Sequence, residues 1–149
     1  MPTILVPLLM AFDQILKLWA LENLSPVPRP FLGDLLYLTL VKNTGAGFGL
    51  LEGQAFLLGW LSLGVGILLL YLLAQRRYTF WQTLALSLIA VGALGNGIDR
   101  LGRGWVVDYL DLGTSIPLIA NFPVFNLADV CVTGGALLLL LAPRRRRRL

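Results

Sequence analysis

The residues in this chain that could carry out chemistry are few, and two aspartates are the strongest candidates. Asp129 closes the run Phe122-Pro-Val-Phe-Asn-Leu-Ala-Asp129, where a hydrophobic segment begins. A carboxylate at membrane depth is costly, so such an acid is a functional-site candidate by default. Asp108 lies upstream. Two close aspartates share one proton, so one can activate water while the other donates to a scissile carbonyl oxygen. This is the chemistry of aspartyl proteolysis.

The residue pattern alone leaves the second acid open. Asp99, Asp108 and Asp111 all lie between the last two hydrophobic stretches, and spacing does not choose among them. Asp129 also has a simpler interpretation, as an acid attracted by the positive end of a helix dipole. Asn126 lies three residues before Asp129, so on a helix the two side chains would share one face.

Other hydrolytic chemistries find little support. The chain has no histidine and a single cysteine, Cys131, which argues against a zinc site and excludes an internal disulfide. None of the serines lies in a recognisable motif or beside a base; they are Ser25, Ser62, Ser87 and Ser115. We therefore expect neither a metal nor a cofactor.

The composition predicts a membrane protein. Of the 149 residues, 57% are hydrophobic and 13% are charged, and the mean hydropathy is +0.79. Weakly charged stretches predict four transmembrane helices, at approximately 3–20, 54–75, 79–98 and 124–143. The first has no basic leader, which favours a retained anchor over a cleaved signal. We expect an α-helical membrane protein with a single domain over 1–149.

The basic residues predict an orientation. Arg76 and Arg77 join the second and third helices, and Arg144–Arg148 follow the fourth. The positive-inside rule then places both termini in the cytoplasm and the segments 21–53 and 99–123 outside. The arginine run also permits a nucleic-acid interpretation, but directly after a span it is more simply a topology signal that meets anionic lipid. We expect a monomer whose surroundings are membrane lipid, with no nucleic-acid partner.

The first outer segment is more than a linker. Residues 34–43, from Asp34 to Asn43, are rich in β-branched and aromatic residues and lead into Asn43-Thr-Gly, a pattern typical of a strand followed by a turn. The glycines that follow let the backbone bend or approach a ligand. The sequence predicts a small β-rich extracytoplasmic platform between the first and second helices.

Other polar residues at membrane depth permit two interpretations. Asp13 and Lys17 have i, i+4 spacing near the outer end of the first helix, as in a structural ion pair. Asn96 and Arg100 have the same spacing where the third helix leaves the membrane. Asp99 lies between them. Arg100 suits a snorkelling anchor, and equally the three hydrogen-bonding groups on this turn suit a peptide backbone or lipid headgroup.

Four ordered blocks resemble the lipoprotein signal peptidase family, signal peptidase II. They are Asp13-Gln-Ile-Leu-Lys17, Asn43-Thr-Gly-Ala-Gly-Phe48, Gly95-Asn-Gly-Ile-Asp-Arg100 with Gly104-Trp-Val-Val-Asp108, and Phe125-Asn-Leu-Ala-Asp129. Asp-Gln-x-x-Lys is weakly specific, whereas the third and fourth blocks together are strongly specific. The resemblance covers nearly the whole chain. One departure is Gly47, where the family more often has Ala.

The resemblance implies an aspartyl endopeptidase of the bacterial cytoplasmic (inner) membrane. It would remove the signal peptide from diacylglyceryl-modified prolipoproteins by cleaving before the lipidated cysteine, at a site toward the outer face. The resemblance selects Asp108 and Asp129 as the catalytic pair. It also assigns residues that hold the substrate backbone or support the aspartates, namely Asn43, Gly45, Asn96, Arg100, Asn126, Asp13 and Lys17.

Two alternatives belong to other classes. In a small transporter or proton-coupled channel, Asp13, Lys17 and Asp129 would line a polar path. That alternative calls for acids on both sides of a pathway, whereas the candidate acids here gather toward one predicted face. If the protein were a structural assembly factor, the Asn, Asp and Arg residues at membrane depth would have no function.

Overall fold

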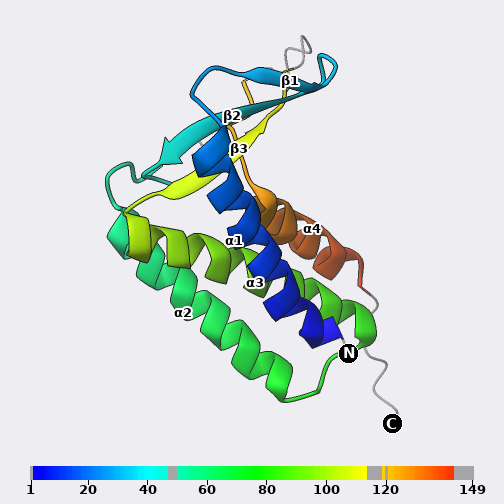
Figure 1. Cartoon of the computed structure of the whole chain (residues 1–149). Coiled ribbons are helices and arrows are strands. Elements are labelled where there is room, and N and C mark those ends of the chain that lie inside the picture. Colours follow the sequence, from blue (N-terminus) through cyan, green and yellow to red (C-terminus); the bar gives the residue numbers. More distant parts are fainter. Residues whose placement is uncertain (1, 47–49, 114–118, 120, 143–149) are drawn as a thin grey trace.

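The structure is a computed structural model that describes residues 2–46, 50–113, 119 and 121–142. In this part of the chain a 3-10 turn, Pro2–Ile4, leads into helix α1, Leu5–Asn23, and three further helices follow: α2, Ala55–Ala74; α3, Phe80–Arg103; and α4, Leu127–Leu141. Helix α3 packs against each of the other three. A small sheet lies at one end of the helices, and the N-terminus lies at the other end (Figure 1).

Local signals explain both ends of α3. Thr79 and Gln82 form a reciprocal capping box at its start, which satisfies backbone N–H groups that have no partner inside the helix. At its end Gly104 adopts φ +81°, and its N–H donates to the carbonyl of Arg100. The helix therefore runs to Arg103 rather than to the predicted residue 98, and Asn96, Asp99 and Arg100 all belong to it.

The sheet has the antiparallel order β1-β2-β3 and is built from both connecting segments. Strands β1, Arg29–Leu32, and β2, Leu36–Asn43, come from the first segment, where a strand was predicted. Strand β3, Val106–Asp111, comes from the second segment, where no strand was predicted. The sheet is therefore not formed only by the chain between α1 and α2. In β2, Val41 lies opposite Asp108 and Asn43 lies opposite Val106.

A short bridge ties the start of α4 to the sheet. Phe125 pairs with Leu110 in β3, with N···O distances of 2.8 and 2.9 Å. Asn126 follows in an extended conformation and caps α4, so the helix begins at Leu127 and not at the predicted residue 124. Asn126 and Asp129 are thus cap and third helical residue, rather than two residues on one helix face.

Small residues let the helices approach closely around the polar interior. A Cβ added at Gly95 would lie 2.7 Å from a carboxylate oxygen of Asp13, and one at Gly92 would collide with the carbonyl of Ala128. Any larger residue at these positions of α3 would push α1 or α4 away. Close packing of three helices thus depends on these positions.

The helix surfaces differ in how they suit a membrane. Among the described residues, α2 and α3 are long and apolar enough to cross a membrane, while α4 is apolar but has 15 residues. Helix α1 buries Asp13 and Lys17 and exposes apolar side chains, among them Leu8, Phe12 and Ile15. Its polar face points inward, the reverse of a helix on the surface of a soluble protein.

Two features of the sequence analysis lie outside the described residues. One is the part of the glycine-rich turn that contains Gly47 and Phe48, and the other is the arginine run at 144–148.

The turn at Gly104 yields a matched test. We expect Gly104→Ala to lower the free energy of unfolding by about 1 to 2 kcal/mol, because a left-handed conformation strains any residue with a Cβ. Gly102→Ala is the control, since Gly102 is helical with open space around it, and alanine favours helix there. Chemical unfolding in detergent measures both, and equal effects would contradict the role of the turn.

Candidate active site

The structure brings Asp108 of β3 and Asp129 of α4 to one cavity. This cavity has a volume of about 190 Å³, and its lining includes both aspartates together with Asn43, Asn96 and Arg100. Asp108 is 1% exposed, whereas Asp129 is partly exposed. A second hollow, of about 250 Å³, contacts Asp108 from the side of Asn43 and Gly45. Water and a peptide could reach the two carboxylates from this side of the molecule.

Every oxygen of the two carboxylates accepts a hydrogen bond. Asp108 accepts from the side-chain amides of Asn126 and Asn43, at 2.8 and 2.9 Å. Asp129 accepts from the side-chain amide of Asn96 at 2.8 Å and from the backbone N–H of Asn126 at 3.0 Å. Amide donors stabilise a carboxylate without neutralising it, so the site can hold negative charge and still exchange a proton.

Lys17 fixes the orientation of the Asn96 amide. Its ammonium donates to Asn96 Oδ1 at 2.9 Å, and Asn126 Nδ2 donates to the same oxygen at 3.1 Å. An ammonium has no acceptor, so only the oxygen of Asn96 can face it. The nitrogen of that amide must then face Asp129. A buried lysine on α1 therefore determines which hydrogen bond the carboxylate on α4 receives.

Side chains from β3, from α1 and from the cap residue Asn126 also hold the first turn of α4. The N–H of Leu127 donates to the Tyr109 hydroxyl, that of Ala128 to Asp13, and that of Asp129 to Asn126 Oδ1, at 3.3, 3.1 and 3.0 Å. These are N–H groups that an α-helix cannot satisfy internally. Their partners anchor the turn that carries Asp129.

A compensated group of four charges supports this framework. Lys17 lies 2.9 Å from Asp13 and 3.0 Å from Asp99, and Asp99 lies 2.6 Å from Arg103. Asp13, Lys17 and Asp99 are fully buried. Two acids and two cations cancel, which removes the large cost of an unpaired buried charge. The predicted Asp13–Lys17 ion pair is confirmed, but it is half of a larger cluster.

Arg100 is the cation on the side of the aspartates. Its guanidinium donates to the carbonyl of Gly45 at 2.9 Å and attracts both Asp108 and Asp129 electrostatically. Gly45 in turn donates its N–H to Asn43 Oδ1 at 3.0 Å. The predicted residues Asn43, Gly45 and Arg100 therefore connect the loop after β2 to the carboxylate pair.

Burial changes the acidity of Asp108. Desolvation, with the nearby charge of Asp129 second, raises the pKa of Asp108 from 3.8 to about 7, against the opposing effect of its amide donors. An acid with this pKa can hold a proton near neutral pH. Among the described residues no three acidic or cysteine side chains are grouped so as to hold a metal ion.

The three candidate acids Asp99, Asp108 and Asp111 lie in three different environments. Asp108 faces the cavity, Asp99 is bound to Lys17 and Arg103, and Asp111 lies at the far end of β3 opposite Tyr37. Supporting roles were not predicted for Arg103, for Tyr109 or for Gln14, whose side-chain amide donates to Asp13 and Asp99 at 3.3 Å. For Arg103 the i, i+4 spacing from Asp99 was an available signal. For Tyr109 no local pattern shows that its hydroxyl reaches α4.

Solved structures share this fold. Two structures described as a bacterial membrane enzyme, solved by the in meso method at 2.3 and 1.9 Å resolution, superpose with TM-scores of 0.81 and 0.79. Each has 30% sequence identity and covers 93% of this chain, and the match covers 85% and 90% of the respective neighbours. The arrangement of helices and sheet is therefore that of a membrane enzyme.

The sequence comparisons identify the family. Residues 5–143 match the model of signal peptidase (SPase) II. A lipoprotein signal peptidase from Nostoc punctiforme is 43% identical over 83% of this chain and 76% of its own length. One from Deinococcus radiodurans is 42% identical over 92% of this chain and 75% of its own length, and one from Clostridioides difficile is 38% identical over 90% and 88%.

The chain belongs to the signal peptidase II family and is a peptidase, a hydrolase of peptide bonds. The predicted family is confirmed, and so is the predicted function, removal of signal peptides from prolipoproteins. The family assignment favours the hydrolase over the transporter and the assembly factor.

Lys17 provides a test of the charge cluster. Lys17→Met keeps the length of the side chain but leaves Asp13 and Asp99 without their shared cation. We expect a loss of about 3 to 5 kcal/mol of unfolding free energy, as for other broken buried pairs. Lys42→Met is the control, since Lys42 is exposed and lies over Trp105, and we expect a change within about 1 kcal/mol.

A double variant separates charge from packing in the same cluster. Asp13→Asn combined with Lys17→Met removes one charge of each sign, so we expect it to recover part of the stability lost in Lys17→Met. A double variant that is less stable than Lys17→Met would contradict this account of the cluster.

Proposed function

We propose that Asp108 and Asp129 form the catalytic dyad of an aspartyl endopeptidase. In this proposal the enzyme removes the signal peptide from diacylglyceryl-modified prolipoproteins by cleaving before the lipidated cysteine. The observation that carries the proposal is that both carboxylates line one cavity and, among the described residues, accept hydrogen bonds only from amide groups. In the part of the chain that the structure describes, neither forms a direct ion pair, in contrast to Asp13 and Asp99.

The charges around the pair favour a single shared proton. With one proton on the dyad, Asp108 and Asp129 together carry one negative charge, which Arg100 balances. The four-charge cluster behind them is already neutral. A second negative charge would therefore be left uncompensated in a largely buried site.

The reaction then needs only the dyad and water. The ionised aspartate accepts a proton from water while the water oxygen bonds to the scissile carbonyl carbon. The protonated aspartate donates its proton to the carbonyl oxygen. Proton transfer to the amide nitrogen then allows the C–N bond to break. Asn96, Asn126 and Asn43 hold the carboxylates in place during both transfers. Arg100 and the carbonyl of Gly45 lie where a substrate backbone could bind.

An apolar hollow beside Asp129 suits the substrate. It has a volume of about 350 Å³ and lies next to the cavity that holds the dyad; its lining includes Phe122, Phe125, Asp129, Val130, Thr133 and Leu137. A signal peptide and diacylglycerol chains are both apolar, so they would gain by burial against these side chains. The polar cavity would receive the scissile bond.

We also propose that all four helices span the bacterial cytoplasmic membrane, with both termini in the cytoplasm. Helix α1 supports this because its charges face the bundle while apolar side chains face outward. Helix α4 has 15 residues and is about 22 Å long, shorter than a hydrocarbon core of about 30 Å. Asp129, in its first turn, would then lie within the outer boundary of the membrane, where water and lipidated substrate meet. The sheet would rest at this outer side, and the enzyme would act as a monomer.

Substitution of each acid tests the dyad. We expect Asp108→Asn and Asp129→Asn each to abolish cleavage of a diacylated prolipoprotein by purified protein in detergent, because an amide cannot accept or share the proton. Asp111→Asn is the matched control from the same strand, and it should retain activity. Full activity in either dyad variant, or loss of activity with a chelator, would contradict the proposal.

The pKa of Asp108 predicts the pH dependence. Because this pKa is raised from 3.8 to about 7, the folded protein keeps the proton on Asp108 below about pH 7 and loses it above. We expect kcat/KM to fall about ten-fold per pH unit above that point, as the dyad loses its only proton. The protonated acid also favours the folded state, and this contribution is lost as pH rises from about 4 to about 7. A cleavage rate that keeps increasing in alkaline solution would contradict this assignment.

A further inference from the structure

We propose that a cavity at the other end of the helices binds the phosphate group of an anionic phospholipid, with Arg76 as its cation. The cavity lies between the end of α2, the start of α3 and the N-terminal turn, at the end of the bundle away from the sheet (Figure 1). It takes no part in the proposed peptidase chemistry, so the inference goes beyond that function. Only its assignment to the cytoplasmic leaflet rests on the proposed orientation.

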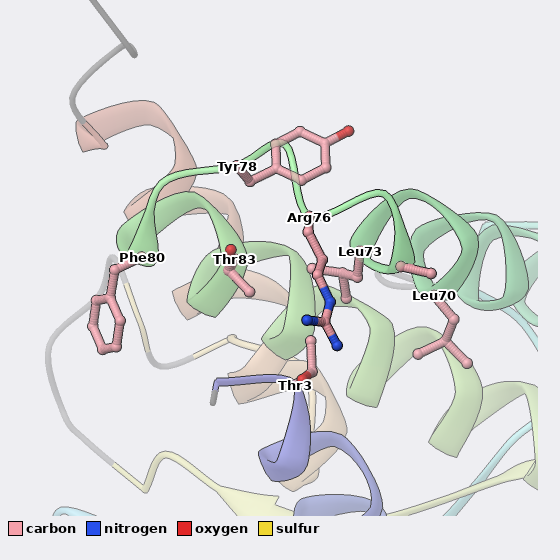
Figure 2. A pocket seen from close by; sticks show the side chains of 8 residues that line it. Thr3, Leu70, Leu73, Arg76, Tyr78, Phe80 and Thr83 are labelled. Carbon is pink, nitrogen blue, oxygen red and sulfur yellow. The ribbon is translucent and has the colours of Figure 1, made fainter.

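The cavity is the largest of those described above and combines one cation with apolar walls. Its volume is about 510 Å³, and its lining includes Thr3, Leu70, Leu73, Arg76, Phe80 and Thr83. Figure 2 shows the Arg76 side chain extending from the α2–α3 connection toward Thr3, between Leu73 and Thr83. The guanidinium therefore occupies the hollow itself.

Arg76 is held in an unusual way for an exposed arginine. Its backbone has φ +51°, in the left-handed region that usually takes glycine at the end of a helix. In the described part of the chain, its guanidinium has no hydrogen-bond or ion-pair partner. A strained backbone and an unpaired cation in one hollow indicate that this position serves something other than stability.

The charges nearby favour an anion. The chain has no acidic residue before Asp13 and none between Gly53 and Ile98, a range that includes both walls of the cavity. Arg77 adds a second positive charge beside the site. No carboxylate of the cavity walls therefore competes for Arg76, and an anion that enters meets the positive field of this guanidinium.

The apolar walls favour a phospholipid as the source of that phosphate. Leu70 and Phe80 line the cavity and are exposed, on helices that are long and apolar enough to cross a membrane. A phosphodiester with acyl chains would place its charge on Arg76 and its chains along these side chains. Inorganic phosphate would gain nothing from the apolar walls. Among the described lining residues it would find one cation, Arg76, with the hydroxyls of Thr3 and Tyr78 as further donors.

The test compares two neighbouring arginines. The full chain in detergent is titrated with dioleoyl phosphatidylglycerol, and bound lipid is counted by native mass spectrometry, with Arg76→Gln and Arg77→Gln as the variants. The two variants lose the same charge, but only Arg76 lines the cavity. We expect Arg76→Gln to weaken binding about five-fold more than Arg77→Gln, the effect of one lost lipid contact. Dioleoyl phosphatidylcholine should bind more weakly than phosphatidylglycerol, and millimolar inorganic phosphate should not displace the bound lipid.

Three results would overturn the proposal. Equal weakening by the two variants would indicate general attraction to a basic surface. Equal binding of the two lipids would remove the preference for an anion, and displacement by inorganic phosphate would identify a soluble ligand. Because lipid is counted without any cleavage, a failed lipid site and a failed peptidase dyad would be told apart.

Discussion

A buried carboxylate destabilises a protein unless a cation or hydrogen-bond donors surround it, and this constraint governs the structure. Asp13, Asp99 and Asp108 are all buried, and Asp129 lies beside them. The protein meets the constraint in two ways. Asp13 and Asp99 form ion pairs, in which a cation balances their negative charge. Asp108 and Asp129 accept hydrogen bonds from amides, which do not neutralise the negative charge. That difference separates a supporting cluster from a site that can exchange protons.

Lys17 joins the two groups. Its ammonium binds Asp13 and Asp99 on one side and the Asn96 oxygen on the other, so each of its three hydrogens has an acceptor. The orientation of Asn96 then follows, and with it the hydrogen bond to Asp129. Precise placement of reacting groups usually requires such support from residues that do not react. In this chain the support comes through α3, which packs against every other helix.

A membrane enzyme that hydrolyses peptides must also admit water without exposing its helices to it. The sheet provides a way to do both, because β3 carries Asp108 while its neighbour Phe125 leads directly into α4 and Asp129. One acid thus comes from the sheet and the other from the helix bundle. The proposed dyad lies where the sheet meets the helices, a place that would suit a lipidated peptide with polar and apolar parts.

The sequence by itself determined the helices, one strand and the family. Long apolar stretches predicted α1, α2 and α3, and for α1 and α2 the predicted bounds agree with the structure to within a few residues. This is because burial in lipid or protein requires long runs of apolar residues, which the sequence shows directly. The pattern before Asn43 indicated β2, and the ordered blocks indicated the candidate residues. The ends of α3 and α4 were missed because they depend on Gly104 and on the cap at Asn126, which hydropathy does not register.

The residue pattern left open which acid accompanies Asp129, the family resemblance selected Asp108, and only the tertiary structure gave the physical reason. Asp99, Asp108 and Asp111 are the same residue type and lie close together in the chain, so the sequence pattern does not distinguish them. Pairing of β3 with β2 and with Phe125 places Asp108 at the cavity. The tertiary structure also showed that Asp13 and Lys17 belong to a four-charge cluster behind the site. The physical reason is that these contacts join residues distant in sequence, such as Lys17 with Asn96, and no local pattern encodes them.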